Sequence, residues 1–123
     1  MTLDKDKREY NRFEPLKEIY TIKYSMEVEI GFIVDISKSG VKLLIEKNEV
    51  SQLGSTFTFR THLPAILKHK HIDIPVRQAW KTNEAINGYQ EIGCYFEELS
   101  DNQKALIHQL VDLYETLRTG KKK

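Results

Sequence analysis

The sequence predicts a mainly β domain, built as a small antiparallel barrel or sandwich and followed by one helix. Three observations predict this class. Apolar and polar residues alternate with a period of two in several short segments. Turn signals such as Lys38-Ser39-Gly40 and Asn87-Gly88 separate these segments, and the last segment has helical spacing instead. The length of 123 residues is typical of one domain.

Composition excludes several classes of protein. Hydrophobic residues make up 40% of the chain, too many for a disordered protein, and no apolar run is long enough for membrane insertion or a secretion signal. Cys94 is the only cysteine, so we expect no internal disulfide and a reducing, cytoplasmic setting. Basic residues number 19 and acidic residues 18, whereas proteins that grip DNA have a clear basic excess. We therefore expect no nucleic-acid polymer as a partner.

The first part of the chain predicts an arm and then a strand. Residues 1–18 are polar and contain Pro15, which is typical of an arm outside the main core. Residues 19–30 alternate strictly, which predicts one long, bent strand with a buried apolar face. That face consists of Tyr20, Ile22, Tyr24, Met26, Val28 and Ile30. Gly31 then indicates a bulge or a bend.

Shorter strands are expected after this point. They cover residues 32–37, 41–45, 72–80 and 89–96, with a further strand around Phe57 and Phe59. Pro75 favours an edge position or a bulge, because proline cannot donate to a strand ladder. Asn87-Gly88 suits a tight hairpin turn. The segment 61–71 fits the strand pattern poorly, and its role stays open.

The C-terminal segment predicts a helix over about residues 101–118. Ser100 and Gln103 form a capping-box pattern, and Gly120 is suited to end the helix. Apolar residues recur at helical spacing, namely Leu106, Ile107, Leu110, Val111, Tyr114 and Leu117. This stripe must pack on the barrel or on a partner, while residues 121–123 form a basic, solvated tail.

Two short motifs carry the chemistry. Arg8 and Arg12 form R-x-x-x-R, and Asp35, Ser37 and Gly40 form D-x-S-x-x-G, with 22 residues between the motifs. Asp35 and Ser37 are two residues apart, so on a strand they share a face. We expect Gly40 to turn the chain with a positive φ and to let a ligand approach the backbone.

These residue types complement guanine and phosphate. An arginine fork matches the O6 and N7 acceptors of guanine, and a carboxylate accepts hydrogen bonds from its N1–H and N2–H₂ groups. Adenine fits poorly, because its N6 donor replaces O6. Arg8 and Arg12 can divide base and phosphate contacts between them.

Together the two motifs resemble the signature of the PilZ domain family, bacterial receptor modules for cyclic di-GMP. The resemblance covers nearly the whole chain, and residues 91–96 are similar to the last strand of the family. It implies a six-stranded antiparallel, split β-barrel over residues 19–120, with an N-terminal arm and a C-terminal α-helix. It also implies that Arg8 and Arg12 bind guanine and phosphate, that Asp35 and Ser37 hold a guanine edge, and that Gly40 shapes the turn.

The leading hypothesis is a cyclic di-GMP receptor or adaptor with no catalytic activity. It would relay the level of this second messenger to an unidentified protein partner by ordering its arm. Lys7 occupies a position linked in the family to binding of one ligand or a stacked pair, so ligand stoichiometry stays open, as do the oligomeric state and the output. Trp80 and Tyr10 are candidates to stack on a base, although each also fits a purely structural position.

Three other functions fit the sequence less well. A ligand-independent PilZ-like adaptor is the main alternative, although such adaptors tend to lose the arginines that this chain keeps. A binder of single-stranded nucleic acid conflicts with the near-neutral charge. A hydrolase would need a base near Asp35 and Ser37, and no histidine is near them in sequence. His69 and His71 lack accompanying cysteines or carboxylate clusters, so we expect no metal site and no cofactor.

Overall fold

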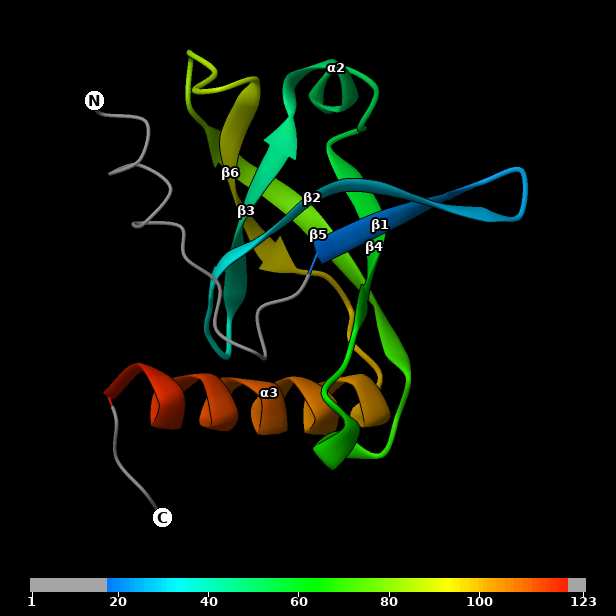
Figure 1. Cartoon of the computed structure of the whole chain (residues 1–123), viewed down its shortest axis with the longest axis vertical. Coiled ribbons are helices and arrows are strands. Elements are labelled where there is room, and N and C mark those ends of the chain that lie inside the picture. The colour runs from blue at the N-terminus through cyan, green and yellow to red at the C-terminus, as the bar shows by residue number, and fades with distance from the viewer. Residues whose placement is uncertain (1–17, 120–123) are drawn as a thin grey trace.

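A computed structural model describes residues 18–119 of the chain, including the side chains of residues 18–116. Six antiparallel strands close into a barrel in the order β1-β2-β3-β6-β5-β4, which confirms the expected mainly β fold (Figure 1). The strands are β1 (Glu18–Lys23), β2 (Met26–Ile36), β3 (Gly40–Glu46), β4 (Thr56–His62), β5 (His71–Lys81) and β6 (Tyr89–Phe96). Two short helical turns, α2 (Lys47–Val50) and η1 (Ala65–Leu67), connect strands, and α3 (Asp101–Thr119) ends the described chain. Arg8, Arg12 and the tail 121–123 lie outside the described residues.

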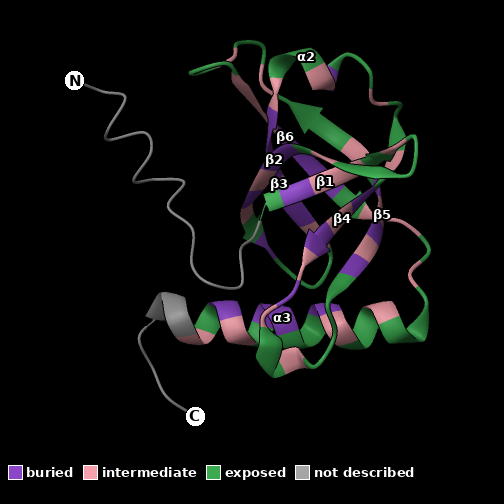
Figure 2. Ribbon diagram, turned by 45° about the vertical axis from the view of Figure 1, so that its right-hand side comes forward, coloured by how far each residue is buried: buried purple, intermediate pink, exposed green. Residues whose placement is uncertain are grey.

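The core fills the barrel and continues under α3, which lies across one end of it (Figures 1 and 2). Large aliphatic and aromatic side chains from all six strands are almost completely buried, including Ile19, Ile30, Ile33, Leu43, Ile45, Phe59, Ile74 and Ile92. The helix adds Ile107, Leu110, Val111 and Tyr114 to the same core. Each such side chain contributes about 1.5–3 kcal/mol on burial. The described part of the apolar stripe of α3 packs on its own barrel. No helix among residues 18–119 is long and apolar enough to cross a membrane.

The prediction of one long strand over residues 19–30 is wrong. The chain reverses at Tyr24 and Ser25, which have φ values of 51° and 64°, so that β1 and β2 form a hairpin with Lys23 opposite Met26. Two positive φ values match the favoured two-residue hairpin turn, which is usually Asn-Gly. Neither residue type predicts this turn, and the alternation of apolar and polar residues continues across it without a break. The hairpin projects from the barrel (Figure 1), and Tyr24 at its tip is 96% exposed.

Gly31 fulfils the expected role beside a bulge. The register of β1 against β2 shifts between Ile19 and Tyr20, so that Ile30 is the extra residue next to Gly31. A Cβ atom on Gly31 would collide with the carbonyl oxygen of Leu44 on β3. The glycine therefore permits the close approach of strands at the point where the hairpin leaves the barrel.

Pro75 lies on an interior strand and not at a bulge, contrary to the expectation of an edge position or a bulge. Strand β5 pairs with β4 on one side and with β6 on the other. The carbonyl of Pro75 accepts a hydrogen bond from the N–H of Glu97, just after β6 has ended. Because the nitrogen and carbonyl of a strand residue face the same side, the missing N–H falls beyond the β6 ladder and removes no bond to β4.

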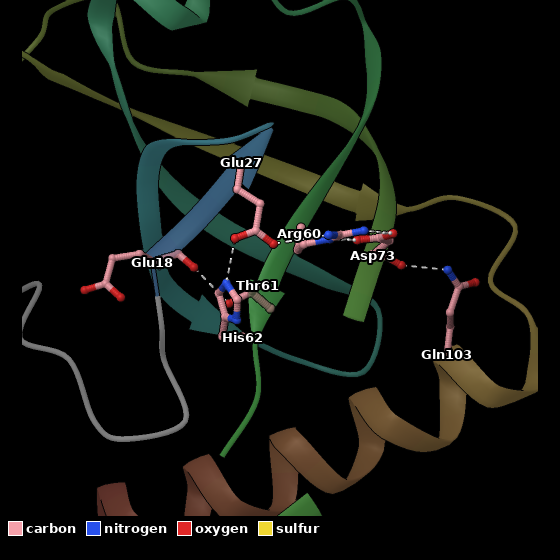
Figure 3. A network of polar contacts seen from close by, with 7 residues as sticks. All are labelled: Glu18, Glu27, Arg60, Thr61, His62, Asp73 and Gln103. Carbon is pink, nitrogen blue, oxygen red and sulfur yellow. Dashed lines mark hydrogen bonds and ion pairs between the residues drawn. The ribbon is translucent and has the colours of Figure 1, made fainter. Parts of the chain in front are cut away.

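A polar network lies beside the shortest strand pairing of the barrel (Figure 3). There β1 pairs with β4 through two residue pairs. Arg60 donates to both carboxylate oxygens of Asp73, at 2.8 and 3.1 Å, and to Glu27 at 3.1 Å. Glu27 also lies 3.1 Å from the Nε2 atom of His62. Hydrogen bonds from Arg60 lower the pKa of Asp73 and of Glu27, which keeps both carboxylates ionised. The network therefore ties the projecting hairpin to β4 and β5.

The capping box at the start of α3 is confirmed. The N–H of Ser100 donates to Oε1 of Gln103 at 2.7 Å, and the N–H of Gln103 donates to Oγ of Ser100 at 3.1 Å. The amide of Gln103 also donates to the carbonyl of Asp73 on β5 at 2.7 Å, a contact visible in Figure 3. One side chain thus caps the helix and fastens it to the barrel.

We expect Gln103→Ala to lower the free energy of unfolding by about 1–2 kcal/mol, because it removes a cap and leaves a carbonyl without its partner. Urea denaturation measures the change. Gln109→Ala is the matched control, since Gln109 is exposed on the same helix, and should change stability by less than about 0.5 kcal/mol. Equal effects of the two substitutions would contradict the role given to Gln103.

Candidate ligand-binding site

The D-x-S-x-x-G motif forms the tight connection from β2 to β3. The N–H of Ser37 donates to the carbonyl of Gly40 at 2.9 Å. The hydroxyl oxygen of Ser37 accepts hydrogen bonds from the N–H groups of Ser39 and Gly40, at 3.3 and 3.2 Å. This arrangement is a serine turn, in which the side chain holds its own loop. Ser37 therefore sets the shape of the loop beside Asp35.

Asp35 presents an exposed carboxylate on the outer face of the barrel. Its Oδ1 atom accepts a hydrogen bond from the N–H of Ile36 at 2.9 Å. A register shift between Ile33 and Asp35 makes Val34 a bulge residue, which sets the direction of the next side chain. Within residues 18–116, no cation forms an ion pair with Asp35. The carboxylate is consequently available to a ligand that offers N–H donors.

The expected positive φ at Gly40 is wrong, because Gly88 is the only glycine among residues 18–119 with a positive φ. Gly40 is instead the first residue of β3 and pairs with Tyr95 on β6. A Cβ atom on Gly40 would collide with the carbonyl oxygen of Cys94. Close approach of two strands, and not turn geometry, requires glycine here.

Register aligns four side-chain positions in one row across the barrel. Asp35 lies opposite Lys42, Lys42 lies opposite Gly93, and Gly93 lies opposite Trp80. Directly opposite residues of an antiparallel sheet face the same side, and neighbouring strands are about 4.8 Å apart. The row therefore places an acid, a cation, a gap and an indole side by side on the outer face.

The indole of Trp80 occupies the space that Gly93 leaves free. A Cβ atom on Gly93 would collide with the Nε1 and Cε2 atoms of the ring, so the indole lies directly against this glycine. A register shift between Gln78 and Trp80 marks a bulge at Ala79 that precedes the ring. Trp80 stays 47% exposed, which leaves part of the ring accessible to a planar ligand.

These residues border a shallow groove of about 240 Å³. It is lined by Asp35, Ile36, Ser37, Ser39, Gly40, Val41, Lys42, Ala79, Trp80, Gly93, Cys94 and Tyr95. Sequence reasoning found the motif residues and Trp80 but missed Lys42 and Gly93. Cross-strand pairing brings those two to the groove, and no local motif marks them.

One thiol, that of Cys94, lines the described groove. Burial raises the pKa of Cys94 to about 12, so its thiol is protonated at neutral pH. Within residues 18–116 no three histidine, cysteine, aspartate or glutamate side chains gather closely enough to hold a metal ion.

The start of β1 lies at the end of the sheet that carries the groove. β1 is antiparallel to β2 with Glu18 opposite Phe32, so the amino end of β1 lies three residues along β2 from Asp35. Three strand residues span about 10 Å. Arg12 precedes Glu18 by six residues, a length of chain that reaches at most about 20 Å. The arginine motif lies outside the described residues. The chain from Glu18 back to Arg12 is nevertheless long enough to span the distance between Glu18 and Asp35.

Comparisons with known proteins found a matching family model and similar solved structures. A family model described as "PilZ domain" matches residues 6–113, and no curated protein sequence matches the chain. The PilZ domain with c-di-GMP of YcgR from Escherichia coli is similar in structure, with a TM-score of 0.62 and 11% identity over 90% of this chain and 92% of that chain. The Borreliella burgdorferi PlzA protein in complex with c-di-GMP matches with a TM-score of 0.53 and 12% identity, over 99% of this chain and 58% of that chain. At such low identity the two structures establish the shared fold.

Proposed function

The chain belongs to the PilZ domain family, and we propose that it is a receptor that binds cyclic di-GMP in the groove between Asp35 and Trp80. The observation that carries this proposal is the exposed Asp35 carboxylate, which forms no ion pair within residues 18–116, beside an accessible indole and near the point where the arginine-bearing segment joins the barrel. Both similar structures contain c-di-GMP, which supports the same ligand class for this chain.

Each side of guanine has a proposed partner. Asp35 accepts hydrogen bonds from N1–H and N2–H₂, and one arginine of the R-x-x-x-R motif donates to O6 and N7. The remaining arginine pairs with a phosphodiester, because a guanidinium fork matches its two oxygens. Ser37 keeps the loop in place and helps to hold the guanine edge. Gly40 allows the loop to continue into β3, which packs closely against β6. Adenine reverses the polarity at the position of O6, so cyclic di-AMP should bind poorly.

Ligand binding would order the N-terminal arm against the barrel and so signal to a protein partner. The ligand bridges residues from two separate parts of the chain, and order–disorder changes of a segment are a common form of switch. Hydrogen exchange of residues 1–17, measured with and without cyclic di-GMP, tests this step. Slower exchange with ligand supports the relay, whereas unchanged exchange at saturation argues against it.

The receptor assignment is tested by calorimetry of the full chain with cyclic di-GMP, cyclic di-AMP and GMP. We expect heat of binding with cyclic di-GMP and affinities at least tenfold lower for the other two, because each loses a matched donor–acceptor pair or half of the ligand. Absence of binding to cyclic di-GMP would leave the ligand-independent adaptor as the better interpretation.

Trp80→Ala should weaken binding of cyclic di-GMP roughly tenfold, because stacking of one base on an aromatic ring is worth about 1–3 kcal/mol. Trp80 is the only tryptophan of the chain, so ligand binding should also change its fluorescence in the wild-type protein. Trp80→Phe keeps an aromatic face and should retain most of the affinity. Equal affinity of the alanine variant and the wild type would place the base elsewhere.

A further inference from the structure

Lys42 is the one cation among the described residues that line the groove. It lies on β3 between two register partners, Asp35 on β2 and Gly93 on β6, and it shares the outer face with both. Gly93 has no side chain to separate Lys42 from the indole of Trp80, which covers that glycine. The ammonium group is therefore attached at the middle of the row, with a flexible four-carbon stem that reaches either end of it.

The present partner of Lys42 holds it weakly. Its Nζ atom lies 3.9 Å from Oε2 of Glu91, beyond hydrogen-bond distance, and its side chain is 40% exposed. Ion pairs of this exposed kind contribute little to stability, because water and salt screen them. Lys42 can thus turn from Glu91 toward a stronger anion in the groove at small cost.

A dinucleotide brings two phosphodiester charges to a groove whose described lining already holds the carboxylate of Asp35. In the proposed arrangement one arginine of the R-x-x-x-R motif contacts guanine and the other pairs with one phosphodiester, while Asp35 adds a third negative charge to the groove. The phosphates and the Asp35 carboxylate repel one another unless a further cation lies between them. Lys42, directly opposite Asp35, is the described groove residue that can supply this charge.

We infer that Lys42 is a further ligand-binding residue of this groove and donates to a phosphodiester oxygen of the bound dinucleotide. This inference rests on the proposed function and extends it to a residue outside the two motifs. Glu91 then acts as the resting partner of Lys42, and it competes with the ligand for the ammonium group.

Calorimetry of full-length variants with cyclic di-GMP at low salt provides the test. We expect Lys42→Ala to weaken binding roughly tenfold, the loss of one charge-assisted hydrogen bond. Lys42→Arg keeps the charge and should remain within about threefold of the wild type. Lys70→Ala is the matched control, because Lys70 is an exposed lysine that does not line the groove, and it should leave the affinity unchanged. Thermal melting of each variant without ligand checks that the barrel is intact.

A second pair of variants tests the competition with Glu91. Glu91→Gln should tighten binding about twofold to threefold in the wild-type background and should have no such effect in Lys42→Ala, because the gain depends on the released ammonium group. Wild-type affinity of a folded Lys42→Ala variant, in a protein that binds cyclic di-GMP, would overturn the inference and leave the receptor function standing. Failure of the wild-type protein to bind would overturn the receptor function itself, and this inference with it.

Discussion

Asp35→Ala and Arg12→Ala should each weaken binding of cyclic di-GMP at least tenfold while the domain stays folded. Asp35 is exposed and forms no ion pair within the described residues, so its removal leaves the core and the polar network intact. The bound guanine, in contrast, would lose the acceptor for its N1–H and N2–H₂ groups. A hydrogen bond to a charged group contributes about 1.5–3 kcal/mol, or roughly tenfold to a hundredfold in affinity.

Calorimetry measures both affinities, and each variant has a control of the same charge. Asp112→Ala removes an exposed carboxylate from α3, and Lys5→Ala removes a basic residue upstream of the arginine motif. Neither control should change the affinity by more than about twofold. Wild-type affinity in both Asp35→Ala and Arg12→Ala would contradict the assignment of the two motifs to one ligand.

The sequence predicts best where a structural element depends on its own residues. The capping box at Ser100 and Gln103 is local, and the structure reproduces both of its hydrogen bonds. The strands that follow residue 31 are likewise marked by alternation and by turn signals such as Asn87-Gly88, where both residues have positive φ values. Local chemistry is sufficient for the cap and for the turn because each is formed by residues that are close together in the sequence.

Prediction fails where a partner from another strand decides the outcome. Tyr24 and Ser25 form a hairpin turn that is stabilised by the pairing of β1 with β2, and not by the usual Asn-Gly preference. Lys42 and Gly93 reach the groove only through the register of β3 against its two neighbours. A period of two indicates which residues share a face, but it does not indicate which strand lies beside them.

Gly40→Ala should lower the free energy of unfolding by about 2–3 kcal/mol even without ligand. The added methyl group would collide with the carbonyl oxygen of Cys94, a backbone atom that cannot move without disturbing the pairing of β3 with β6. Urea denaturation of the ligand-free protein measures this effect. Because Asp35 and the loop depend on the same pairing, the affinity for cyclic di-GMP should fall as well.

Gly54→Ala separates this mechanism from a general effect of replacing glycine. A Cβ atom on Gly54 would have its nearest neighbour, the carbonyl oxygen of Thr56, at 3.3 Å, and Gly54 is exposed. This control should change stability by less than about 1 kcal/mol. If Gly40→Ala lost ligand binding but unfolded at the same urea concentration as the wild type, the ligand would be what requires glycine at this position. Loss of stability in the absence of ligand instead means that Gly40 is required for the pairing of β3 with β6, and that it affects ligand binding indirectly, through that pairing.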